Sequence, residues 1–152
     1  MSPDVNNPAY RALTYDELAA AYQQQMEAML EGGVDAILIE TIFDTLNAKT
    51  AIFAAEQAMK VTGVEVPVML SVTVSDVGGR TLSGQTLDAF LASVQHANIF
   101  SVGLNCSFGA RQLKPFLEQL AVRAPYYISA YPNAGLPNSL GKYDQTPADM
   151  AP

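Results

Sequence analysis

The order of its short apolar runs constrains the fold of this chain more than any other feature. Four such runs, at residues 36–39, 68–70, 101–104 and 127–130, alternate with segments of helical periodicity. Apolar runs of this length between turn residues are typical of buried strands. Because strand, helix and strand repeat along the chain, the sequence predicts parallel βαβ units and an α/β fold.

Start and stop signals mark the helices between these runs. Residues 14–17 (Thr-Tyr-Asp-Glu) have the pattern of a capping box, which predicts that the first helix begins there. Asp44 is placed to cap a second helix, and Gly63 is placed to end it. A third helix is expected at about residues 86–97, and a fourth follows the third apolar run. Residues 132–152 are rich in Pro, Asn and Gly and are expected to form a loop.

The predicted sheet is too small to close on itself. Four parallel strands, each apolar on both faces, leave two free edges, and a complete (β/α)8 barrel typically needs about 250 residues. This chain has 152 residues, with an extended lead-in at residues 1–13, a helix before the first strand and a loop after the last. We therefore expect a partial (β/α)8 TIM barrel of four parallel strands with flanking helices. It would form one domain over residues 1–152, with both ends of the barrel missing.

Composition excludes several classes of partner. The net charge of −7 and the eight scattered Lys and Arg residues argue against nucleic-acid binding. No apolar run approaches the roughly 18 residues of a membrane span, and no secretory leader opens the sequence. A single cysteine excludes an internal disulfide framework. These features together predict a soluble, cytoplasmic protein.

Cys106 is the only cysteine, and it lies between the third apolar run and an expected turn at residues 107–109. Parallel α/β folds place their chemistry at this end of a strand. The thiol could be a small buried hydrophobic group, a nucleophile or a metal ligand. A nucleophile usually needs a histidine as base, and His96 is expected near the end of the third helix, far from the strand ends. From the residues alone, Cys106 belongs to an incomplete zinc site or to no site.

Glu40 ends the first apolar run. An unpaired carboxylate is costly to bury, so this group must be solvated, paired or bound to a cationic ligand. One interpretation pairs it with Arg80 or Lys49. The other has it receive the ammonium group of an amino-acid ligand, and the residues leave both open.

Four stretches of the sequence match one known family: residues 38–49, 79–86, 103–106 and 132–138. Together and in this order they resemble the homocysteine-binding domain of cobalamin-dependent methionine synthase. The likeness runs from about residue 8 to residue 147. It implies a (β/α)8 barrel whose mouth holds zinc on three cysteines. The zinc binds the thiol of homocysteine, and the methyl group arrives from methylcobalamin on another module.

The resemblance also implies roles for individual residues. Cys106 resembles the first of the three zinc cysteines, and Asn133 lies where an amide oxygen could fill the fourth zinc position. Glu40 resembles the carboxylate that holds the amino group of the substrate. Ser71 and Asn105 fall where the family lines its substrate pocket. Zinc binding would remove the thiol proton of the substrate and keep a reactive sulfur at neutral pH.

The sequence also departs from the family. The other two zinc cysteines form a Gly-Gly-Cys-Cys-Gly run in the family, and this chain has no such run. The folate and cobalamin modules are absent as well. We therefore expect the isolated chain to be inactive, with homocysteine, the remaining barrel segments and those modules as its partners, and with self-association through its open edges. Two alternatives remain: a homocysteine methyltransferase that uses S-adenosylmethionine or betaine, and a half-barrel that binds or assembles without catalysis.

Overall fold

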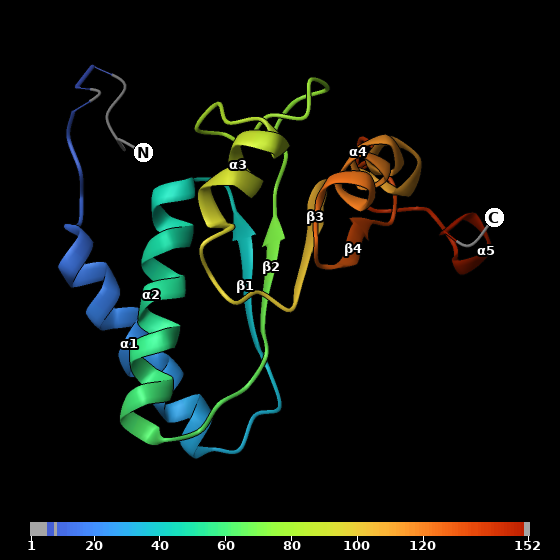
Figure 1. The fold of residues 1–152 in the computed structure, drawn as a ribbon. Helices are drawn as coiled ribbons and strands as arrows, with labels where there is room; N and C mark the ends of the chain where they lie inside the picture. Colours follow the sequence, from blue (N-terminus) through green and yellow to red (C-terminus); the bar gives the residue numbers. More distant parts are fainter. Residues whose placement is uncertain (1–5, 8, 151–152) are drawn as a thin grey trace.

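A computed structural model describes residues 6–7 and 9–150, and in it four parallel strands form one sheet flanked by helices (Figure 1). The elements, in chain order, are α1 (Tyr15–Glu31), β1 (Ile37–Ile42), α2 (Thr45–Thr62), β2 (Val68–Val72), α3 (Leu87–Val94), β3 (Ser101–Gly109), α4 (Ala110–Arg123), β4 (Tyr127–Asn133) and α5 (Pro147–Met150). The predicted α/β class with four parallel strands is confirmed. The parts of the expected lead-in and tail at residues 1–5, 8 and 151–152 lie outside the described residues.

The strands lie in the sheet in the order of the sequence, β1-β2-β3-β4. Each neighbouring pair is parallel, and each is joined through a helix, as βαβ units require. β1 and β4 each have one strand neighbour among the described residues, so both edges of the sheet are open. Because all the strands are parallel, their carboxyl ends lie at one end of the sheet.

The two faces of the sheet differ in character, so the expectation of strands apolar on both faces is wrong. One face carries Leu70, Val72, Val102 and Leu104, which are fully buried in the core shared with the helices. Alternate residues point to the opposite face, because side chains along a strand alternate with a period of two. That face carries small and polar side chains in β3, Met69 and Ser71 in β2, and exposed apolar side chains near the edges, such as Tyr127 at 70% exposure.

The predicted helix ends at Thr14, Asp44 and Gly63 are confirmed. The Thr14 hydroxyl accepts a hydrogen bond from the Glu17 backbone N–H, and the Glu17 carboxylate accepts one from the Thr14 N–H in return. Asp44 caps α2 by accepting from two backbone N–H groups of its first turn, at 2.9 and 3.1 Å. Gly63 ends α2 in the left-handed conformation, at φ 70°.

Three predicted boundaries differ from the structure. α3 ends at Val94, three residues before the expected end, and Gln95 follows it as the cap residue. β3 continues to Gly109, so the turn expected at residues 107–109 is an irregular part of the strand. The expected loop contains the end of β4 and the short helix α5. None of the helices in the described part of the chain has both the length and the apolar character needed to cross a membrane.

Candidate functional site

A buried amide joins three strands at their carboxyl ends. Asn105 of β3 is 1% exposed, and its Oδ1 accepts hydrogen bonds from Ser71 Oγ at 2.8 Å and Thr73 Oγ1 at 3.4 Å. Its Nδ2 donates to Thr41 Oγ1 at 2.9 Å and to Cys106 Sγ at 3.2 Å. An asparagine amide has two donors and one oxygen with two lone pairs, so this side chain uses its full capacity within the protein.

The backbone at this position is strained in two strands. Thr41, Cys106 and Ser107 have φ values of 61°, 57° and 59°, and no other non-glycine residue in the described ranges has a positive φ. The ladders of β1 and β3 shift register over the same positions. A non-glycine residue in this conformation costs about 1–2 kcal/mol, and such strain and bulges concentrate at functional sites. The bulge in β3 leaves Cys106 half-buried, so its thiol is not sealed in the core.

Glu40 lies directly before the strained Thr41, and its side chain is exposed. The first interpretation, an ion pair with Arg80 or Lys49, does not hold. The ion pair found among the described residues joins Arg123 to Asp88. Arg80 donates instead to the backbone carbonyl of Gly84, at 3.1 Å. The solvated carboxylate is therefore open to a ligand.

Ser71 and Asn105, which the resemblance places in the substrate pocket, lie beneath the open surface. Both side chains are buried, and they bond to each other. Their polar atoms are directed at protein groups, which suits the floor of a site. A direct contact with substrate stays a prediction for both residues.

Asn133 is the last residue of β4, and its side chain is half-buried. It pairs with Gly109, three positions after Cys106, in the ladder between β3 and β4. The fold therefore brings Asn133 and Cys106 to the carboxyl ends of neighbouring strands. A shared role in holding a metal stays a prediction.

The long loop between β2 and α3 is ordered at the same end of the sheet. An antiparallel bridge joins Val74 to Thr81, and Ser83 donates from its N–H and its hydroxyl to the carbonyl of Phe43, at 3.2 and 2.8 Å. In Figure 1 this loop stands at the arrowhead end of β1 and β2. The contacts tie the loop to the segment that follows Glu40.

Sequence reasoning noted Thr41 and Thr73 among the polar residues after the apolar runs but gave them no role in the site. Both follow predicted apolar runs, where a hydroxyl side chain is a natural partner for a buried amide. That signal is weak, because threonine is also common in strands for its branched shape. Only the register of β1, β2 and β3 brings the two hydroxyls to Asn105.

The described residues do not form a complete zinc site. They contain no group of three or more His, Cys, Asp or Glu side chains that could hold a metal. Structural and catalytic zinc sites use three or four protein ligands, and Cys106 supplies one thiolate. His96 is exposed in the turn after α3. We assign no chemical step to a metal on these residues.

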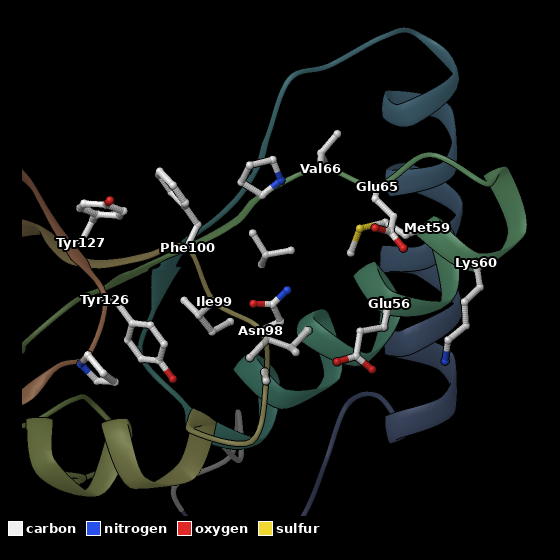
Figure 2. A pocket seen from close by; sticks show the side chains of 15 residues that line it. Glu56, Met59, Lys60, Glu65, Val66, Asn98, Ile99, Phe100, Tyr126 and Tyr127 are labelled. Atoms are coloured by element: carbon white, nitrogen blue, oxygen red, sulfur yellow. The ribbon is translucent and has the colours of Figure 1, made fainter.

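A hollow of about 970 Å³ lies at the end of the sheet opposite to Cys106 (Figure 2). Its walls come from the second half of α2 and from the starts of β2, β3 and β4, and include Glu56, Met59, Val68 and Phe100. Enzymes with parallel α/β sheets place their chemistry at the carboxyl ends of the strands. The candidate site is therefore the strained, polar end around Cys106.

This arrangement is that of a partial (β/α)8 barrel, and a solved structure shares it. The crystal structure of the homocysteine methyltransferase MmuM from Escherichia coli, in its apo form, matches with a TM-score of 0.68 and 22% sequence identity. The match covers 95% of this chain and 58% of that chain, and at this identity it shows the fold. A family model described as homocysteine S-methyltransferase matches residues 1–152. The chain belongs to the homocysteine S-methyltransferase family.

Proposed function

We propose that this chain is part of the homocysteine-binding barrel of a cobalamin-dependent methionine synthase. In that reaction methylcobalamin, bound on another module, would supply the methyl group, and the homocysteine sulfur would accept it with loss of the thiol proton. The observation that carries the proposal is the half-buried Cys106 thiol in contact with the Asn105 amide, whose other N–H donates to Thr41, the residue after Glu40. The family match supports homocysteine as the methyl acceptor.

In this proposal the two ends of the substrate meet different strands. The exposed carboxylate of Glu40 binds the ammonium group of homocysteine, as a charge-assisted hydrogen bond. The sulfur lies toward Cys106 and Asn133. Zinc at that position, with further cysteines outside these residues, and methylcobalamin on another module stay predictions from the resemblance. The cytoplasmic location and the single domain with missing barrel ends, which were inferred from composition and length, stay predictions as well.

The methyl donor separates this proposal from its enzymatic alternative. The stretch at residues 79–86 favours the cobalamin enzyme over one that uses S-adenosylmethionine or betaine. It belongs to the loop that is pinned to the end of β1, beside the site. A loop at that position would contact whichever donor approaches the sulfur.

The open sheet edges support an assembly role beside the catalytic one. β1 and β4 each lack a second strand partner in the described sheet, and unpaired strand edges readily pair with other strands. We propose that these edges pair with further barrel strands, or with a second copy when the chain is isolated. A half-barrel without a catalytic role would also assemble through these edges, but it would not bind homocysteine.

Binding of L-homocysteine to the isolated chain tests the proposal. We expect its addition to shift the NMR signals of Glu40 and Cys106, and Glu40→Gln to weaken binding about tenfold, because a charge-assisted hydrogen bond contributes about 1.5–3 kcal/mol. Glu56→Gln, an exposed carboxylate at the other end of the sheet, is the matched control and should leave the affinity unchanged. Shifts confined to the hollow near Glu56, or equal losses in the two variants, would contradict the proposal.

A further inference from the structure

We propose that Asn105 is a positioning residue, which fixes the orientation of the Cys106 thiol and couples it to Thr41, the strained residue of β1 that follows Glu40. The inference deepens the proposed function and rests on it for one point only, that the thiol belongs to the working site. The geometry itself is independent of the reaction.

The first argument is the destination of the two N–H bonds of the Asn105 amide. One goes to the side chain of Thr41 and the other to that of Cys106. These are two of the three non-glycine residues with positive φ in the described chain, and they lie in different strands. One amide therefore holds a strained residue in each of two strands.

The second argument is that the amide is itself firmly held. Asn105 is 1% exposed, and Ser71, at 0% exposure, donates to its oxygen from the neighbouring strand. A buried amide with four partners has little freedom to rotate, since any new orientation would leave polar groups unpaired. The thiol therefore contacts a rigid donor.

The third argument concerns what else could orient the thiol. Cys106 is half-buried, and the Asn105 amide is the polar partner that the structure gives to its sulfur. Packing on one side only leaves a side chain free to change its χ1 rotamer. Without the amide, we expect the thiol to sample several rotamers while the strand stays folded.

The consequence for the site is a fixed spacing. Thr41 directly follows Glu40, so the same amide that holds the thiol also holds the strand residue beside the carboxylate. In the proposed function these groups receive the opposite ends of one amino acid. Asn105 would set the distance between them through its hydrogen bonds to Thr41 and Cys106.

The test measures the χ1 rotamer of Cys106 in the free chain, from three-bond NMR couplings, with circular dichroism as the check on folding. We expect one dominant rotamer in the wild type and averaging over several rotamers in Asn105→Ala. Asn98→Ala, an exposed asparagine at the opposite end of the sheet, is the control and should keep the wild-type couplings.

Two further variants keep the test decisive if Asn105→Ala does not fold. Thr41→Val keeps the shape of the side chain but loses the hydroxyl, and should broaden the rotamer distribution. Thr41→Ser keeps the hydroxyl and should restore the single rotamer, which a purely steric role of Thr41 would not predict. An unchanged single rotamer in folded Asn105→Ala or Thr41→Val would overturn the proposal, as would averaging in the wild type.

This test is separate from that of the proposed function, because no homocysteine is present. If the rotamer is fixed by Asn105 but homocysteine does not bind, the positioning role stands and the proposed function fails. If homocysteine binds and the rotamer does not depend on Asn105, the proposed function stands and the positioning role fails.

Discussion

Asn105 and Thr41 are 64 positions apart in the sequence, and the side-chain amide of the first donates a 2.9 Å hydrogen bond to the hydroxyl of the second. The bond crosses from β3 to β1 over the carboxyl end of β2. It closes a network that also includes Ser71, Thr73 and Cys106. The polar side chains at this end of the sheet thus form one hydrogen-bond network. Breaking that network should lower both the stability of the chain and its affinity for a ligand.

We expect Asn105→Ala to lower the free energy of unfolding by about 2 kcal/mol. The substitution leaves the buried Ser71 hydroxyl without its partner, and an unsatisfied buried group costs about 1–3 kcal/mol. Urea unfolding measures the change. Asn98→Ala, exposed and outside the network, should stay within about 0.5 kcal/mol of the wild type. Equal effects of the two substitutions would show that the network contributes nothing.

Gly103 is expected to tolerate no side chain. A Cβ at this position would overlap the carbonyl oxygen and the hydroxyl of Ser129 in β4. Gly103→Ala should therefore cost about 3 kcal/mol, because the overlap involves backbone that cannot move without separating the strands. Gly63→Ala is the control: that position has φ 70° and no neighbour within 4 Å, so it isolates the backbone strain, at about 1 kcal/mol. Similar urea midpoints for the two variants would contradict the close approach of β3 and β4.

The capping box predicts a pH dependence for α1. The backbone N–H of Thr14, followed by its hydroxyl, holds the pKa of the Glu17 carboxyl below its ordinary value of 4.5. A carboxyl with a lowered pKa in the folded state stabilises the protein above its unfolded pKa, and this stabilisation is lost as pH falls through the folded value. The stability difference between the wild type and Glu17→Gln should be constant near neutral pH and shrink below pH 4.5.

Chemical unfolding at a series of pH values checks this expectation. Glu65→Gln, an exposed carboxylate in the loop before β2, is the comparison. A stability difference for Glu17→Gln that grows as the solution is acidified would have the wrong sign and would exclude the capping contribution.

The open edge of β4 should drive self-association of the isolated chain. Ala130 is exposed on this edge strand, and a lysine there would place a charge where a second strand has to pair. In sedimentation velocity we expect concentration-dependent association for the wild type and a shift toward monomer for Ala130→Lys. Ala121→Lys adds the same charge on the exposed side of α4 and should behave as the wild type does. A wild type that stays monomeric at high concentration would count against the half-barrel description.

Local signals in the sequence were enough to predict most of the elements. Thr14 with Glu17, Asp44 and Gly63 each act on neighbouring backbone groups, and the structure confirms all of these helix ends. The apolar runs predicted four parallel strands in chain order, because each run needs a crossover helix before the next. The boundaries of α3 and β3 were less predictable, since tertiary burial and strand pairing decide where a regular element stops.

The sequence by itself determined which chemical groups this chain carries to the ends of its strands: one thiol, one carboxylate and several amides and hydroxyls. Only the tertiary structure decided how they meet. Three of the partners of Asn105 lie 32, 34 and 64 positions away, and the strained conformations of Thr41 and Cys106 coincide with shifts in strand register. The physical reason is that hydrogen bonds between strands depend on register and on twist, which no local pattern of residues specifies.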